Sequence, residues 1–224
     1  MQNIPARDEY RNCFEAKPGN KIVTMDYSGQ ELRLIAEGSQ DSTWLDAFRN
    51  GEDVHGKVAS MVFNMDISKV KTKPKFLKGK SYRDVAKTIN FGLAYGMSYY
   101  KLADTLDISQ DKAKEFIDKY FDALPKIKKF LNALGNYGKK YGHIKTFKPY
   151  RRMIKYALSL LLRYINDHNL HDKVKLITQV HDEIGCEVKK DFVNEWVEIQ
   201  RELMMLAGKK ICKSVDMVVD HSVS

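Results

Sequence analysis

The segment VKLITQVHDEIGCEV, residues 174–188, decides the fold that this sequence predicts. Two short runs rich in Val and Ile flank the triplet His181, Asp182 and Glu183, and so close a spacing is typical of a β-hairpin with a tight turn. We therefore expect both acids at the hairpin tip, on an exposed edge. Adjacent carboxylates repel each other, which indicates that something positively charged uses them.

The sequence on either side of the hairpin predicts a mixed α+β fold. KIVTM (21–25) is a short β-prone run that ends at Asp26, and residues 31–38 then space their apolar side chains as a helix does. Asp26 thus lies where a strand gives way to a helix. Beyond the hairpin, residues 192–208 predict a helix that covers one sheet face, and residues 215–223 a last strand.

The middle of the chain predicts mainly helices. Residues 81–96 form one of them, and its Arg83, Lys87, Phe91 and Tyr95 follow at four-residue steps, which places them on one helix face. The lysine-rich residues before it contain a proline and a glycine, which predicts a mobile basic loop. Further expected elements are a helix capped by Ser109, a helix over 126–140 ended by Gly142, a short strand at 143–147, and a core helix at 153–165.

Composition and charge narrow the class of protein. Apolar residues make up 43% of the 224, but no apolar run approaches the roughly 18–20 residues that cross a bilayer. The first residues lack a secretory pattern, which favours the cytoplasm. Three widely spaced cysteines without a CxxC pair predict neither a disulfide framework nor a zinc site. The net charge of +9 favours a polyanionic partner such as nucleic acid.

Asp26 and Asp182 share a position at the end of a predicted strand, and together they suit divalent metal ions. A two-metal site uses carboxylates to hold ions that act on the attacking and leaving oxygens of a phosphoryl transfer. Arg83 and Lys87 would then bind a triphosphate, and the aromatic residues on the same stripe would stack near a base or sugar. Without further context, such acids are more often a solvated hairpin tip than a metal site, and such cations are usually a solvent-facing helix side.

Three segments resemble, in family order, motifs A, B and C of family A, polymerase I-like DNA polymerases: DYSGQELR (26–33), RDVAKTINFGLAYG (83–96) and QVHDE (179–183). Shorter matches extend the resemblance over nearly the whole chain: QNIPAR (2–7), FRNGEDVH (48–55), KYFDALP (119–125) and YGHIKT (141–146). The resemblance implies a palm with an antiparallel sheet (1–33 and 151–224) and an inserted, mainly helical fingers subdomain (34–150).

The resemblance also implies a metal site and a sugar gate. Asp26 and Asp182 would bind two Mg²⁺ ions, for which Mn²⁺ can substitute, with the backbone carbonyl of Tyr27 as a further ligand. Glu31 would occupy the space of a ribose 2′-hydroxyl, in company with Tyr95, and so favour deoxynucleotides.

The remaining motif residues would contact nucleotide and DNA. Arg83 and Lys87 would bind the triphosphate of the incoming dNTP, and Lys87 would protonate the leaving pyrophosphate. The resemblance assigns the other contacts as follows: His55 on the phosphate side, Phe91 stacked on the sugar and base, Glu183 beside the primer end, His181 supporting the primer strand, and Arg7 in the minor groove at the primer terminus.

Two departures from the family pattern are expected to weaken DNA binding. The chain begins at QNIPAR, so we expect no thumb and no exonuclease domain in it, and such regions, or a processivity partner, would be separate or missing. PYRR (149–152) runs directly into MIKYAL (153–158), where the family has an arginine-rich helical segment.

The resulting hypothesis is a DNA-directed DNA polymerase that extends a primer on primer-template DNA with dNTPs, in the cytoplasm of a bacterium or a phage-infected host, or in an organelle, with a role in replication or repair. Its alternative is a non-catalytic, basic nucleic-acid-binding remnant of a polymerase fold. A two-metal nuclease is a third reading, which the nucleotide-binding stripe at 83–95 disfavours.

Overall fold

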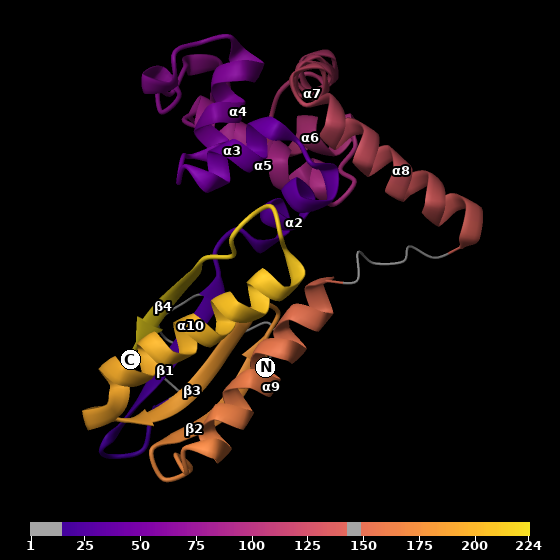
Figure 1. The fold of residues 1–224 in the computed structure, drawn as a ribbon. Helices are drawn as coiled ribbons and strands as arrows, with labels where there is room; N and C mark the ends of the chain where they lie inside the picture. Colours follow the sequence, from indigo (N-terminus) through magenta and orange to yellow (C-terminus); the bar gives the residue numbers. More distant parts are fainter. Residues whose placement is uncertain (1–14, 143–148) are drawn as a thin grey trace. The chain divides into compact units, whose positions relative to one another are not determined.

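The computed structural model describes residues 15–142 and 149–224, which divide into two compact units (Figure 1). The sheet unit consists of the described residues up to Gln30 together with those after Phe147. The helical unit consists of the described residues between these two segments and begins at Glu31. Arg7 and the strand predicted at 143–147 lie outside the described residues.

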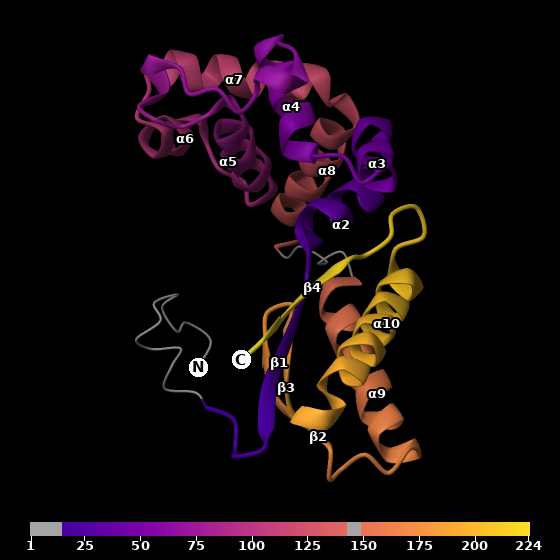
Figure 2. The same cartoon turned by 90° about the vertical axis from the view of Figure 1, so that its left-hand side faces the viewer.

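The sheet unit contains a four-stranded antiparallel sheet in the order β2-β3-β1-β4. Figure 2 shows helices α9 and α10 on one side of the strands, and α10 packs against β1, β3 and β4. This confirms the predicted α+β fold. The elements are β1 (Asn20–Tyr27), α9 (Pro149–Asp167), β2 (Val174–Val180), β3 (Glu183–Lys189), the short 3₁₀ helix η3 (Lys190–Phe192), α10 (Val193–Ile211) and β4 (Val219–Val223).

Alternation along β1 separates a buried face from an open one. Val23, Met25 and Tyr27 are buried, and the hydroxyl of Tyr27 donates a 2.6 Å hydrogen bond to the carbonyl of Met204 in α10. Successive side chains of a strand point to opposite faces, so Asp26 lies on the face away from α10. Burial of a large apolar side chain stabilises the fold by about 1.5–3 kcal/mol, which fixes this orientation of the strand.

The predicted hairpin is present, but its two acids occupy different positions. His181 and Asp182 form the turn, and Val180 pairs with Glu183, the first residue of β3. The expectation that both acids lie at an exposed tip is therefore wrong for Glu183, because the turn needs only two residues and strand pairing resumes immediately. Both carboxylate residues are half-buried.

The helical unit is built from helices, and its main packing contacts are made by α4 with α5, α6 with α7 and α4 with α7. Ser109 caps α7 as expected, and Gly142 ends α8 with a φ of +69°, a conformation that glycine adopts without strain. The elements are α2 (Gln30–Ser39), α3 (Ser42–Arg49), α4 (Val54–Phe63), the 3₁₀ helices η1 (Ile67–Lys69) and η2 (Lys75–Leu77), α5 (Tyr82–Ala94), α6 (Tyr99–Leu106), α7 (Gln110–Ala123) and α8 (Pro125–Tyr141).

The lysine-rich segment before α5 differs from its prediction as a mobile loop. Val70 and Leu77 are 2% and 0% exposed, and the carbonyl of Val70 accepts a 2.8 Å hydrogen bond from the backbone N–H of Arg83. Lys78 pairs with Asp107 beyond the segment. Two buried apolar anchors, hidden among the lysines in the sequence, hold this segment against the unit. Its lysine content indicated solvent exposure and said nothing about these anchors.

No helix in the described parts of the chain is long and apolar enough to cross a membrane.

Candidate active site

In the sheet unit, three carboxylates lie in a row across three strands. Asp26 in β1 pairs with Glu183 in β3 on one side and with Asp220 in β4 on the other. Directly opposed residues of antiparallel strands share one face, with Cβ atoms about 4.5–5.5 Å apart. Glu183, Asp26 and Asp220, called the carboxylate row below, therefore stand on the face away from α10. Asp182 precedes the row in the hairpin turn.

Asp220 was not predicted as a site residue. Its carboxylate is a possible metal ligand by residue type, but its place beside Asp26 follows only from the register of β4 against β1.

The negative charge of Asp26 is electrostatically unfavourable at its place in the carboxylate row. The pKa of Asp26 is raised above its usual value, first because partial burial disfavours its charged form and second because Asp220 repels it; a hydrogen bond with its own backbone acts in the opposite direction. A bound cation would relieve this repulsion, so the row is a place where positive charge is stabilising.

The donor groups fit an open magnesium site. Mg²⁺ prefers oxygen ligands and is usually held by one or two protein carboxylates plus substrate phosphates and waters. Within the described residues, no three His, Cys, Asp or Glu side chains gather as a closed metal cluster. Asp26 and Asp182 would supply the carboxylates of such an open site, and phosphate and water oxygens would complete it.

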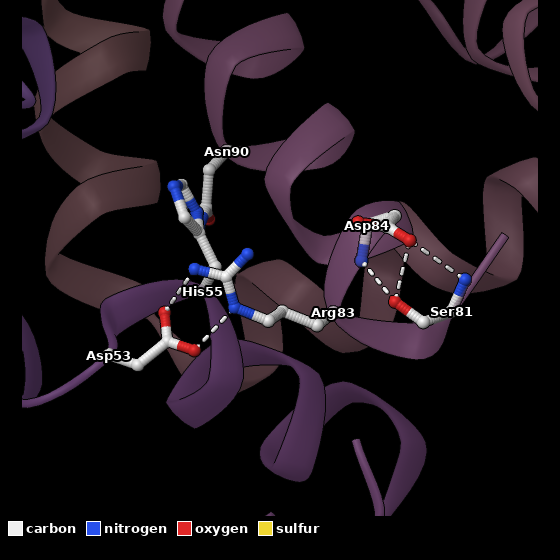
Figure 3. Close-up of polar contacts among 6 residues, drawn as sticks. All are labelled: Asp53, His55, Ser81, Arg83, Asp84 and Asn90. Atoms are coloured by element: carbon white, nitrogen blue, oxygen red, sulfur yellow. Dashed lines mark hydrogen bonds and ion pairs between the residues drawn. The ribbon is translucent and has the colours of Figure 1, made fainter. Parts of the chain in front are cut away.

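In the helical unit, a capping box sets the start of α5. The hydroxyl of Ser81 accepts a 3.1 Å hydrogen bond from the backbone N–H of Asp84, and the Asp84 carboxylate accepts a 3.0 Å bond from the backbone N–H of Ser81 (Figure 3). Such reciprocal capping satisfies two otherwise unpaired N–H groups. Asp84 is thereby used locally, although it is next to Arg83 in sequence.

Arg83 instead forms a two-point ion pair with Asp53, which lies just before α4 (Figure 3). Its Nη2 is 3.0 Å from Asp53 Oδ1 and its Nε is 2.5 Å from Oδ2. The hydrogen bonds that Arg83 donates to the Asp53 carboxylate are the main reason why the pKa of Arg83 is raised. Sequence reasoning missed Asp53, since no local pattern links residues thirty positions apart.

His55 lies beside this pair in a neutral state. Its Nδ1 is 2.9 Å from the side-chain nitrogen of Asn90 in α5, and its ring lies 5.7 Å from that of Phe91 between centroids. Burial, followed by the nearby positive charge of Arg83, lowers the pKa of His55 to about 4. The imidazole is therefore uncharged near pH 7, so Nδ1 accepts from Asn90 and Nε2 keeps its hydrogen as a donor.

Further along α5, Lys87, Phe91 and Tyr95 line one depression of about 560 Å³, together with Thr88, Gly92, Met97 and Lys101. Tyr95 is 72% exposed, and its hydroxyl donates a 2.8 Å hydrogen bond to the carboxylate of Glu31. Three of the four residues of the predicted stripe are thus brought together, with Glu31 bonded to Tyr95, whereas Arg83 does not line this depression. An apolar floor edged by two lysines suits a ligand with a flat ring and negative charge.

The predicted site residues fall into two groups, one in each unit. Asp26, Tyr27, Asp182, Glu183 and His181 belong to the sheet unit, whose turn residue His181 is exposed and has a φ of +52°. The helical unit holds Glu31, His55, Arg83, Lys87, Phe91 and Tyr95.

Comparison with known proteins defines the class. A family model described as DNA polymerase family A matches residues 1–159, and the chain belongs to this family. It is 33% identical to DNA polymerase I of Caldicellulosiruptor bescii over 240 residues, covering 90% of this chain and 27% of that protein. It is 38% identical to DNA polymerase I of Borreliella burgdorferi over 159 residues, which cover 69% of this chain and 17% of that protein.

A solved structure agrees with the fold. The entire chain superposes with a TM-score of 0.86 and 28% identity on 44% of a chain described as the POL domain of Pol1 from M. smegmatis in complex with DNA primer-template and dNTP. The present chain spans about a quarter of the length of several curated relatives that it matches. The match to DNA polymerase I of Chloroflexus aurantiacus, at 30% identity, runs over 258 residues, more than the 224 of this chain, so that protein has residues without a counterpart here.

Proposed function

We propose that this chain catalyses the template-directed addition of deoxynucleotides to a primer 3′-hydroxyl. The observation that carries the proposal is the carboxylate row on one face of the sheet, next in sequence to Asp182 in the hairpin turn, in a member of DNA polymerase family A. The bound primer-template and dNTP of the M. smegmatis structure support DNA and dNTP as partners of this chain.

The two units correspond in this proposal to palm and fingers. Residues 1–33 and 151–224 form the palm and residues 34–150 the fingers, an assignment supported by the unit boundaries after Gln30 and after Phe147. The arginine-rich segment expected by family resemblance would fall between Arg152 and Met153. That junction lies inside α9, a continuous helix, so the shortened connection is compatible with regular structure.

Asp26 and Asp182 would hold the two Mg²⁺ ions, with the carbonyl of Tyr27 as a further ligand. Bound Mg²⁺ would favour the ionised primer hydroxyl and neutralise charge on the phosphates. Glu183 would stand beside the primer end, where its pairing with Asp26 fixes it in the sheet. His181 and Arg7 would contact the primer strand.

The helical unit would bind the nucleotide. Arg83 and Lys87 would contact the triphosphate, and the exposed ammonium of Lys87 would give a proton to the leaving pyrophosphate. His55, uncharged near neutral pH, would donate a hydrogen bond to phosphate through Nε2 and would add no positive charge there. Phe91 would stack on the sugar and base, and Glu31 with Tyr95 would exclude a 2′-hydroxyl.

The test is primer extension by the 224-residue chain on a short primer-template with Mg²⁺ and dNTPs. Asp26→Asn and Asp182→Asn should each reduce extension by at least about a hundredfold, because each removes a charged metal ligand while keeping the side-chain shape. Asp172→Asn is the matched control, since Asp172 is an exposed acid of the same unit outside the carboxylate row. It should extend primers like the parent.

The alternative, a nucleic-acid-binding remnant, gives a different result. The parent chain would then bind primer-template without extending it, with a steep salt dependence that Asp26→Asn and Asp182→Asn leave unchanged, because counterion release needs only lysines and arginines. That outcome, obtained with folded protein, would overturn the proposed catalysis.

A further inference from the structure

The contact between Asp53 and Arg83 has a geometry that orients the arginine. A guanidinium carries five N–H donors in a rigid plane, and Asp53 engages those on Nε and Nη2. Among the six residues drawn in Figure 3, none accepts a hydrogen bond from Nη1. Two parallel bonds fix the plane of the guanidinium, and the opposite edge stays available for a second anion.

Asp53 occupies the N-cap position of α4, where an aspartate side chain normally caps the helix. Its side chain, however, makes no capping hydrogen bond of normal geometry. N-cap aspartates usually bond the backbone N–H groups of the first helical turn. Here burial would raise the pKa of Asp53, but the hydrogen bonds from Arg83, together with the electrostatic attraction of the nearby N–H of Gly56, hold the pKa below its usual value. The carboxylate thus stays charged and is turned toward Arg83.

Gly56 provides the space for this arrangement. A Cβ atom at this position would lie 2.8 Å from Oδ2 of Asp53, and the three heavy atoms nearest to it all belong to Asp53. Non-bonded carbon and oxygen atoms do not approach so closely, so any larger residue would push the carboxylate away. Glycine is otherwise unfavourable inside a helix, which gives its presence at this site a local physical reason.

From these contacts we infer that Asp53 is a positioning residue: it holds Arg83 by one edge and presents the opposite edge to the triphosphate, and Gly56 admits the carboxylate that does so. The inference rests on the proposed function, because it takes Arg83 as a triphosphate contact. An arginine already fixed loses less conformational entropy when it binds phosphate.

Asp53 also has an effect that opposes nucleotide binding, because its negative charge repels phosphate. This repulsion is weak, because the ion pair is about one-third exposed and the charge of Arg83 compensates it. Positioning therefore outweighs repulsion, and loss of the carboxylate should weaken nucleotide binding.

The experiment measures binding of dATP with Mg²⁺ to the 224-residue chain and to its variants. Asp53→Asn should raise the Kd by about threefold to tenfold, the range expected when one flexible side chain must be ordered on binding. Gly56→Ala should raise it similarly without lowering the melting temperature, since alanine favours the helix. Glu52→Gln is the matched control: it removes the same charge from the adjacent residue, which pairs with Lys57, and should leave the Kd unchanged.

Arg83→Ala tests the triphosphate contact of Arg83 separately from the positioning role of Asp53. If this variant binds dATP as the parent does, the assignment of Arg83 to the triphosphate fails. If it binds more weakly while Asp53→Asn and Gly56→Ala do not, only the positioning role fails. In an Arg83→Ala background, Asp53→Asn should cause no further loss of affinity. An additional loss would show that Asp53 does not act through Arg83, and an equal loss in Glu52→Gln would show that the effect is not specific to Asp53; either result would overturn the positioning role.

Discussion

At the scale of single residues, the hydrogen bond between Tyr95 and Glu31 joins the two members of the proposed sugar gate. The Tyr95 ring is largely exposed, and the 2.8 Å hydrogen bond from its hydroxyl to Glu31 restrains it. Glu31 is half-buried at the start of α2. A gate composed of two bonded residues should be more rigid than either residue alone.

Replacement of Glu31 by Ala should therefore relax the preference for deoxynucleotides. We expect the selectivity for dATP over ATP to fall by at least about tenfold, the size typical of one small group added to or removed from a pocket. Tyr95→Phe, which removes only the hydrogen bond, should lower it by about threefold. Competition between dATP and ATP in primer extension measures the ratio, and an unchanged ratio in Glu31→Ala would remove Glu31 from the gate.

At the scale of elements, the β2–β3 hairpin combines a tight turn with a close approach of its strands. The pairing shifts between Leu176 and Thr178, where β2 has one residue more than β3, which is a β-bulge. Opposite the bulge stands Gly185, whose added Cβ would lie 2.5 Å from Cγ2 of Thr178. Glycine at this position lets β2 pass closely and keeps Glu183, two residues earlier, in register with Asp26.

Gly185→Ala should destabilise the protein by about 1–3 kcal/mol, the cost typical of overpacking a tight site. The added methyl has one severe neighbour, the Thr178 methyl, so Thr178→Ser in the same molecule should restore most of the loss. Urea unfolding of the two single variants and the double variant measures the effect. Additive losses in the double variant would mean that the clash with Thr178 is not the cause.

At the scale of the whole molecule, its stability should depend on pH through a histidine in the helical unit. His55 is uncharged in the folded state, with a pKa lowered to about 4 by burial and by Arg83. The unfolded chain binds a proton to this residue near its ordinary pKa of 6.5. Between these values the unfolded state holds more protons, so stability is fully present above pH 6.5 and declines as the pH falls toward 4.

The free energy of unfolding should thus be lower at pH 5 than at pH 7 by about 1–2 kcal/mol, a figure reduced to allow for partial exposure of the ring. His55→Gln, which keeps a polar side chain but does not titrate, should lose this dependence. Urea unfolding at half-unit pH intervals measures both proteins. An equal decline in His55→Gln would assign the dependence to other groups.

Local patterns predicted much of this molecule. Ser109 as a helix cap, the hairpin around His181 and the shared face of Lys87, Phe91 and Tyr95 depend on residues a few positions apart, and turn and helix geometry determine them directly. The same holds for Gly142, whose freedom at positive φ ends α8.

Contacts between distant segments could not be predicted in this way. The bond of Asp53 to Arg83 and the place of Asp220 beside Asp26 depend on how helices pack and how strands align, and no periodicity encodes either. The ordered segment before α5 failed as a prediction for a related reason: only the packed unit shows that Val70 and Leu77 are buried.

The position of β1 in the sheet has a consequence for synthesis on the ribosome. β1 leaves the ribosome before both of the strands that pair with it, β3 and β4, which carry Glu183 and Asp220, the pairing partners of Asp26. The helical unit lies between these segments in the chain, and all of its described helices are translated before the partners of β1 exist. Until then β1 exposes two unpaired edges and an apolar face, the features that make a nascent strand prone to aggregate or to bind chaperones. Completion of the sheet, and with it the carboxylate row, must wait until the last strand has left the ribosome exit tunnel.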